Sequence, residues 1–228
     1  MTSASEIAKM AFLVARATDS DQSAFDPDTL FKPEQMPPET LPVPECNVLS
    51  LAQQAFHKRK SDRVLNNLSL DLNQMNRICT AAYGYLKNGH RTVPSAGSYY
   101  PLKLHVGRIA KGRIQDVYLF DDKAHKLVKL HSVNLPIQDG FFVYGVDFDS
   151  ASYVLLWSCR MTGVASKYGA KGYRFACLEI GHSAQMAVLE CLSESIKHIL
   201  LGGLNESWFQ TNFVRGGRRL LPQYAMVM

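Results

Sequence analysis

The segment 58–63 (KRKSDR) carries side chains that bind anions. Arg59, Ser61 and Arg63 occupy alternate positions, so an extended backbone could direct all three toward one phosphate group. Arginine forms paired hydrogen bonds with phosphate oxygens, and a serine hydroxyl adds another donor. The alternative is that these residues form a solvated charge cluster at the end of a helix.

The segment 91–101 (RTVPSAGSYYP) places small residues between two prolines. Ser95, Ala96 and Gly97 follow Pro94, and their small side chains would let a rigid backbone approach a flat ligand. The amides and carbonyls of such a loop can then contact that ligand. The alternative is an ordinary loop that binds nothing.

The segment 166–174 (SKYGAKGYR) places a lysine beside a tyrosine, followed by two glycines that shape a turn. Lys167 could serve as a base if its amine is desolvated, and the phenol of Tyr168 could donate a proton. The alternative is a surface turn that takes no part in chemistry.

The segment 179–185 (EIGHSAQ) contains a glycine within a predicted helix. Gly181 costs about 1 kcal/mol of helix stability relative to alanine, and a close approach by another helix or a ring would explain that cost. His182 is expected to be a buried, hydrogen-bonded side chain rather than a catalytic one.

The elements that position these segments are predicted from hydrophobic periodicity. Asp71 is expected to begin one helix, and another is expected over 173–200 with Leu178 and Gly181 on its apolar side. Two more helices are predicted over 4–17 and from Asn47 to about residue 59. The predicted strands are 102–106, 117–120, 153–157 and 223–228. Helices that flank a mixed sheet indicate an α+β or three-layer α/β fold.

The composition is that of an ordinary globular protein. Of the 228 residues, 46% are hydrophobic and 20% are charged, which excludes a disordered chain, a collagen-like repeat and a disulfide framework. Residues 1–50 carry three basic and eight acidic side chains, whereas the rest carries 22 basic and 12 acidic ones. A basic body of this kind can bind nucleic acid, an acidic peptide or a phosphorylated ligand.

Proline content divides the chain into two expected parts. Six of the ten prolines fall within 19–45, so residues 1–45 are predicted to form an N-terminal helix and an extended arm, and 46–228 a folded domain. The five cysteines are scattered, which is typical of reduced thiols, and no apolar run reaches 18 residues. These features predict a cytoplasmic protein with no membrane span.

Taken together and in this order, the four segments resemble the SagB-type branch of the flavin-dependent nitroreductase superfamily. The family pattern Arg-Arg-Ser-x-Arg corresponds to 59–63, and the pattern Arg-x-x-Pro-Ser-Ala-Gly-Ala-x-Tyr-Pro corresponds to 91–101, with Ser98 for the usual Ala. The patterns Lys-Tyr-Gly-x-Arg-Gly-Tyr-Arg and Gly-His-x-x-Gln-Asn correspond to 167–174 and 181–186, with Met186 where Asn is typical. The resemblance covers about residues 30–228.

Two regions differ from the family. Residues 192–204 lack the usual Ala-rich helix end with Leu-Gly-Leu, and the chain stops at its last strand without the basic tail that many nitroreductases add to the phosphate site. Three arginines that the patterns do not align could replace that tail: Arg215, Arg218 and Arg219.

The resemblance implies an α+β, nitroreductase-like, FMN-binding fold. Its central sheet is mixed but mainly antiparallel and is flanked by helices, and two chains form an intertwined homodimer with FMN at the subunit interface. Arg59, Ser61 and Arg63 would hold the phosphate and ribityl end or the pyrimidine edge, while residues 95–97 would line the isoalloxazine. The implied cofactor-binding residues are Arg59, Ser61, Arg63, Pro94, Ser95, Ala96, Gly97 and Gln185; no metal is expected.

The implied reaction is FMN-dependent oxidation of a peptide thiazoline or oxazoline to the aromatic azole, during maturation of a ribosomally made peptide natural product. Lys167 would be the base and Tyr168 a proton donor or orienting group. The implied partners are the cyclodehydratase components of a synthetase and an azoline-containing precursor peptide, with no nucleic acid and no membrane.

Three other functions stay open at this point. One is a generic NAD(P)H-dependent nitroreductase or quinone reductase, and another is a flavin-less scaffold in a peptide-modifying complex. A third is a nucleic-acid-binding protein that uses the basic residues, although the sequence has no helix-turn-helix, zinc or RNP-type signature.

Overall fold

The computed structural model describes residues 57–66, 70–87, 89–214 and 220–228. The chain divides between His57 and Lys58, and the fold below is that of Lys58–Met228. The predicted arm over 1–45, the helix over 4–17 and most of the helix that follows Asn47 lie outside the described residues, as do Arg215, Arg218 and Arg219.

Six strands form one sheet in the order β3-β2-β1-β4-β6-β5, and every neighbouring pair is antiparallel. The strands are β1 Leu102–Ala110, β2 Arg113–Asp121, β3 Lys126–Pro136, β4 Tyr153–Cys159, β5 Ile199–Leu201 and β6 Leu221–Val227. All seven residues of β4 are buried, as its continuous apolar run predicts for a central strand. The α+β fold class is confirmed, and the six described strands contain no parallel pair.

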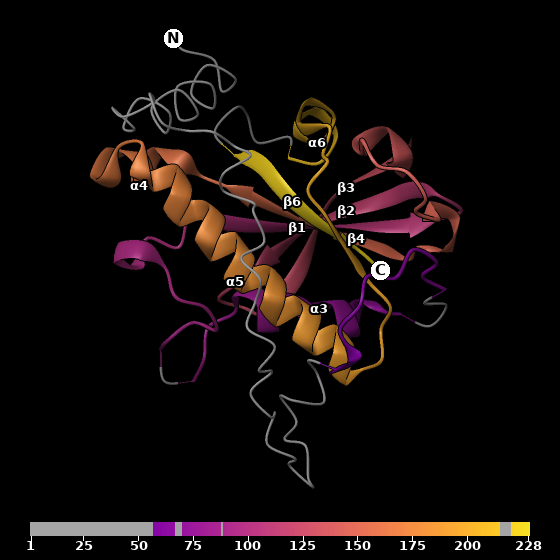
Figure 1. Cartoon of the computed structure of the whole chain (residues 1–228), viewed down its shortest axis with the longest axis horizontal. Coiled ribbons are helices and arrows are strands. Elements are labelled where there is room, and N and C mark those ends of the chain that lie inside the picture. Colours follow the sequence, from indigo (N-terminus) through magenta and orange to yellow (C-terminus); the bar gives the residue numbers. More distant parts are fainter. Residues whose placement is uncertain (1–56, 67–69, 88, 215–219) are drawn as a thin grey trace, which may run out of the picture. The chain divides into compact units, whose positions relative to one another are not determined.

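Helices cover both faces of the sheet (Figure 1). The helices α3 (Leu72–Tyr83) and α5 (Lys171–Ser193) pack against each other and against one face. The short helix α6 (Glu206–Asn212) contributes Phe209 to the core on the other face. The helix α4 (Met161–Tyr168) follows β4 directly and packs against α5.

The start of α3 agrees with its sequence signal. The Asp71 carboxylate accepts a hydrogen bond from the Gln74 amide at 2.8 Å, and the Gln74 side chain accepts one from the Asp71 amide at 3.0 Å. This capping box satisfies amides that a helix start leaves without intrahelical partners. The apolar residues at helical spacing are buried except Leu72, which is 37% exposed; the buried ones are Met75, Ile78, Cys79 and Ala82.

The long helix α5 differs from its prediction in two ways. It ends at Ser193, and the chain then enters β5, so the predicted continuation to residue 200 is wrong. Its buried side includes Glu179 and Ser183, whereas Leu178 is 54% exposed and Gly181 is exposed. The polar pair is buried because each member has a buried hydrogen-bond partner on a neighbouring element.

Two further findings concern the described residues alone. Their four cysteines are free, as predicted, and none of their groups of histidine, cysteine and acidic side chains could hold a metal ion. None of the described helices is long and apolar enough to cross a membrane.

Candidate functional site

The pairing of β1 with β4 brings two of the sequence segments together. Leu102, the first residue of β1, lies opposite Cys159, the last residue of β4. The Arg160 amide donates a hydrogen bond to the Pro101 carbonyl at 2.9 Å. The loop that ends at Pro101 therefore lies beside the start of α4, although about 60 residues separate them in the chain.

Gly97 lies against the lysine–tyrosine pair at the end of α4. Its backbone adopts φ of 60°, which favours glycine, and an added Cβ would collide with the Tyr168 hydroxyl. The same Cβ would lie 2.9 Å from the Lys167 amine. The absence of a side chain at Gly97 thus lets the loop backbone lie directly against the lysine–tyrosine pair.

Aromatic rings hold this pair in place. The Tyr168 ring makes edge-on contacts with Tyr99 at 6.4 Å and Phe175 at 5.0 Å between centroids. The Lys167 amine lies 5.5 Å from the centroid of the Tyr99 ring, within the range of a cation–π interaction. Both residues occupy the last turn of α4, and Gly169, with φ of 56°, caps the end of this helix.

Lys167 is exposed in this structure. The desolvated amine expected from the sequence is therefore not produced by the described part of the chain. Desolvation of this amine requires a bound ligand or a second chain above it.

A buried carboxylate joins the loop to α5. Glu179 is 3% exposed, and its carboxylate accepts a 2.5 Å hydrogen bond from the Tyr83 hydroxyl. The Ser95 side chain also hydrogen-bonds to Glu179, and its hydroxyl oxygen accepts a hydrogen bond from the Tyr100 amide at 2.9 Å. Burial raises the pKa of Glu179, while the hydrogen bonds from Ser95 and Tyr83 act in the opposite direction.

Sequence reasoning missed this network. Glu179 was noted only as the first residue of the 179–185 segment, and Tyr83 lies outside all four segments. No signal in the sequence indicated it, because the hydrophobic periodicity places Leu178 and Gly181, rather than Glu179, on the inner side of the helix.

Arg91 anchors the other end of the loop. Its guanidinium forms a 2.6 Å ion pair with Asp122 and lies over the rings of three tyrosines, at 4.0 to 4.9 Å from their centroids. It also donates a hydrogen bond to the Tyr83 carbonyl at 3.1 Å. These contacts identify Arg91 as a structural residue that fixes the start of the 91–101 segment; the tyrosines are Tyr83, Tyr85 and Tyr100.

The 58–63 segment lies beside β5. The Asp62 amide donates to the His198 carbonyl at 2.9 Å, and the Arg63 guanidinium donates to the Tyr144 carbonyl at 3.1 Å. The side chains of Arg59, Ser61 and Arg63 are exposed. The described contacts of this segment therefore involve a different part of the sheet from those of the 91–101 loop.

The 179–185 segment presents an open surface on α5. His182 is exposed, so the expectation of a buried histidine is wrong, because the adjacent Ser183 and Ala184 occupy the inner side of the helix. An added Cβ at Gly181 would meet nothing within 4 Å. Gln185 is exposed as well, so no described part of this chain makes the close approach expected at the glycine.

Comparison with known proteins agrees with this fold. The family model for nitroreductases matches residues 57–213, which is more than half of the chain. The protein is an oxidoreductase of the nitroreductase family. A relative assigned to the nitroreductases, MJ1384 of Methanocaldococcus jannaschii, is 28% identical over 173 residues, covering 72% of this chain and 84% of MJ1384.

Two solved structures share the nitroreductase fold. The crystal structure of a Ralstonia eutropha JMP134 protein, assigned as a nitroreductase, aligns with a TM-score of 0.65 and 21% identity. The alignment covers 82% of this chain and 86% of the Ralstonia chain. A chain of the E. coli microcin synthetase McbBCD complex, with truncated pro-MccB17 bound, aligns with a TM-score of 0.64 and 20% identity. That alignment covers 99% of this chain and 93% of the synthetase chain.

Proposed function

We propose that this nitroreductase-family protein uses FMN to oxidise thiazolines or oxazolines in a precursor peptide to thiazoles or oxazoles. The observation that carries the proposal is the contact of Gly97 with Lys167 and Tyr168. A loop with a bare backbone lies against an exposed amine and a phenol, which together can remove and donate protons. The likeness of the sequence segments to SagB-type dehydrogenases supports the same reaction.

The residues present fit a flavin. Ala96 and Gly97 offer a backbone without bulky side chains, and Gly97 is exposed, so a flat ring can lie on this loop. Arg59, Ser61 and Arg63 are exposed donors suited to a phosphate. We assign these residues, with Pro94, Ser95 and Gln185, to FMN binding. Ser95 would act through its backbone, because its hydroxyl is engaged within the protein.

Lys167 and Tyr168 would carry out the proton transfer that the oxidation requires. When bound, FMN supplies the two-electron acceptor that the oxidation needs. Lys167 would take the proton from the ring carbon of the azoline, and the edge-on contacts of Tyr168 would keep its hydroxyl beside that amine. A substrate that covers Lys167 would exclude water from its amine. Loss of water disfavours the charged ammonium form, so more of the amine would be neutral and able to accept the proton.

We also propose that two chains form a homodimer through the outer side of α5. Four residues at helical spacing are exposed there: Arg174, Leu178, Gly181 and Gln185. Leu178 is 54% exposed, and Gly181 leaves room for another backbone to approach. A second chain at this position would also bring its own 58–63 segment to the dimer, which would let one FMN contact segments from both chains.

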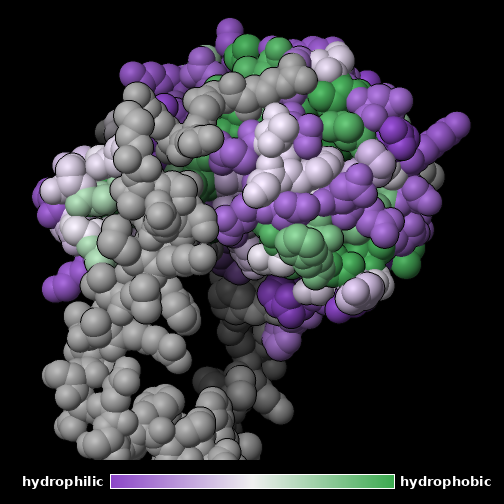
Figure 2. All heavy atoms as spheres, turned by 90° about the horizontal axis from the view of Figure 1, so that it is seen from above, coloured by the Kyte–Doolittle hydropathy of each residue, from purple (hydrophilic) through white to green (hydrophobic). Residues whose placement is uncertain are grey.

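The synthetase likeness suggests the partners. Because the McbBCD chain shares the fold over nearly all of this sequence, we propose that the protein acts with cyclodehydratase components on an azoline-containing precursor peptide, in the cytoplasm. Figure 2 shows hydrophobic patches between hydrophilic residues on one face of the molecule. Exposed aromatic side chains such as Phe142 at 71% and Tyr144 at 95% are available to such partners.

The deciding experiment is mass spectrometry of a cyclised peptide after incubation with the FMN-loaded protein in air. The proposal expects each azoline ring to lose two hydrogen atoms. An unchanged peptide mass in the presence of bound FMN would contradict it.

The second candidate is a generic nitroreductase that uses NAD(P)H. The assigned nitroreductases among its relatives favour this function. It expects NAD(P)H alone to bleach the bound flavin rapidly, and it expects Lys167 to be dispensable. A colourless purified protein that still binds a synthetase would instead indicate a flavin-less scaffold.

A further inference from the structure

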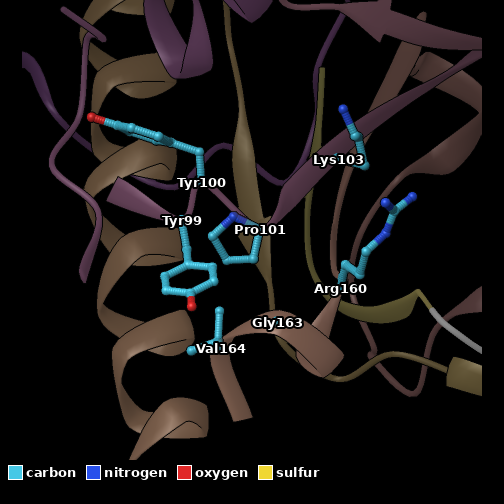
Figure 3. A pocket seen from close by; sticks show the side chains of 7 residues that line it. All are labelled: Tyr99, Tyr100, Pro101, Lys103, Arg160, Gly163 and Val164. Atoms are coloured by element: carbon cyan, nitrogen blue, oxygen red, sulfur yellow. The ribbon is translucent and has the colours of Figure 1, made fainter. Parts of the chain in front are cut away.

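Two cavities meet at Lys103 and Arg160. The first has a volume of about 210 Å³ and lies between the end of the 91–101 loop and α4 (Figure 3). The second has a volume of about 410 Å³ and lies over β1, β2 and β3. Lys103 and Arg160 line both, and Figure 3 shows them on the side of the first cavity opposite Tyr99.

The shared wall is strongly cationic. Lys103 comes from β1 and Arg160 directly follows β4, and the side chains of His105 and His131 add imidazoles to the larger cavity. Of the described residues that line the two cavities, none is acidic. Among the described residues, neither Lys103 nor Arg160 forms an ion pair. Asp121 interacts with Lys103 only through its longer-range charge, so two neighbouring cations that form no ion pair among the described residues favour binding of an anion.

The rest of the larger cavity is apolar. Its lining includes Leu119, Leu130, Val214 and Leu220, and Leu130 is 43% exposed. Leucine and valine side chains at this density favour an aliphatic or aromatic group rather than a fully hydrated ion.

His105 adds a polar group that the chain leaves unused. Its side chain is 2% exposed, and its Nδ1 atom has no hydrogen-bond partner within the described part of the chain. Burial, followed by the charges of Lys103 and His131, lowers the pKa of His105 to about 4. At neutral pH, His105 therefore contributes an uncharged imidazole to the same cavity that the cationic side chains of Lys103 and Arg160 line.

We propose that this cavity is a second binding site, which takes a carboxylate joined to an apolar group. Lys103 and Arg160 would bind the carboxylate, and the leucines would hold the apolar part. If the proposed reaction is correct, the ligand is a stretch of the precursor peptide in which an acidic residue adjoins hydrophobic ones, because the first cavity connects this site to Tyr99 and α4. The identification of the ligand as precursor peptide rests on the proposed function, whereas the binding site does not.

The test is equilibrium binding by calorimetry, with the full-length, FMN-loaded protein and no oxidation step. The probes are acetylated and amidated peptides of sequence Leu-Glu-Leu, Leu-Gln-Leu and Ala-Glu-Ala. We expect Leu-Glu-Leu to bind about five- to tenfold more tightly than either analogue, because Leu-Gln-Leu lacks the charge and Ala-Glu-Ala lacks both leucine side chains. Added salt should weaken its binding.

Variants assign the effect to the cavity. Lys103→Gln and Arg160→Gln should each reduce the affinity for Leu-Glu-Leu to about that of Leu-Gln-Leu. Lys111→Gln removes the same charge just beyond the far end of β1 and should leave the affinity unchanged. Thermal unfolding of each variant shows whether it is folded. If one of Lys103→Gln and Arg160→Gln does not fold, the other is used for the test.

Three outcomes would overturn the proposal. Equal affinity for the three peptides would show that the cavity does not select a carboxylate on an apolar body. Equal losses in Lys111→Gln and Lys103→Gln would indicate general charge attraction. Binding to FMN-free protein that disappears on FMN loading would assign the cavity to the cofactor. Since no turnover is measured, each outcome is independent of whether azolines are oxidised.

Discussion

The Tyr83 hydroxyl donates a 2.5 Å hydrogen bond to the buried Glu179 carboxylate and accepts one of 3.2 Å from the Leu102 amide. One phenol therefore connects α3, the first residue of β1 and α5. Through Ser95, the same carboxylate reaches the loop that contacts Lys167. The position of the candidate site thus depends on a polar contact inside the protein.

Tyr83→Phe should destabilise the protein by about 1–3 kcal/mol, because it removes one hydrogen-bond donor from the buried Glu179 carboxylate and leaves the Leu102 amide without its acceptor. Urea unfolding measures the change. Tyr144→Phe removes a hydroxyl from a side chain that is 95% exposed and should change the free energy of unfolding little. In a double-mutant cycle with Glu179→Gln, additive effects would contradict the contact.

Gly97→Ala should push the Lys167 amine and the Tyr168 hydroxyl away from the loop, because an added Cβ would collide with both side-chain ends. Gly89 also has positive φ, at 79°, but an added Cβ there meets nothing within 4 Å. Both substitutions strain the backbone, so the additional loss of FMN affinity in Gly97→Ala over Gly89→Ala reports the close approach. Titration of the apoprotein with FMN measures it, and equal affinities in the two variants would argue against a tight loop–helix contact.

Lys167→Ala should bind FMN normally and lose azoline oxidation. The loss should be about 10²–10⁴-fold, as for removal of a general base. Single-turnover mass spectrometry under saturating peptide separates the chemical step from binding. Lys123→Ala, an exposed lysine in the β2–β3 turn, is the matched control. Oxidation at the wild-type rate by Lys167→Ala would exclude this residue as the base.

Leu178→Glu should convert the proposed dimer to monomers. It places a charge at the centre of the exposed side of α5, where a second chain would desolvate it. Light scattering should give twice 25.5 kDa for the wild type and 25.5 kDa for the variant. Val128→Glu changes a similarly exposed apolar residue on β3 and should stay dimeric. A wild type that is already monomeric would refute this interface.

His105 should make stability depend on pH between 6.5 and 4. Its pKa is lowered from 6.5 to about 4, so in this range the unfolded chain takes up a proton that the folded chain does not. The free energy of unfolding therefore falls as pH falls, by at most about 3 kcal/mol from this group.

His105→Gln removes this titration, and its stability should decline less steeply toward acid than that of the wild type. His57→Gln, at an exposed position, should follow the wild type. Parallel curves for all three proteins in urea titrations at pH 4 to 7 would contradict the assignment.

The parts of the fold that the sequence predicts well are those with a strong local signal. The helix α3 has a capping box and apolar residues at helical spacing, and β4 has a continuous apolar run. By contrast, β3 (Lys126–Pro136) was not predicted, because none of its residues is buried and it shows no apolar alternation. Its place in the sheet is set by pairing with β2, which is not a local property.

The candidate site also has parts that residue types predict and parts that depend on contacts between distant elements. The segments 91–101 and 166–174 were found from their residue types, but their contact through Gly97 depends on the register of β1 and β4. The outer side of α5 was assigned incorrectly, because periodicity counts Leu178 as core and cannot know that Tyr83 provides a partner for Glu179. Buried polar pairs of this kind reverse the usual preference for apolar residues inside.

The pairing of Leu102 with Cys159 also has a consequence for how this chain can change during evolution. Strand β1 ends at Ala110 and β4 begins at Tyr153 at the end of the sheet remote from Gly97 and Lys167, and the β1–β2 turn lies at that same end. Residues can therefore be inserted or deleted in the β1–β2 turn without altering the spacing of the two segments. A single insertion between Gly97 and Leu102, or between Cys159 and Lys167, would separate them, so length is expected to be constrained there and to vary in the β1–β2 turn.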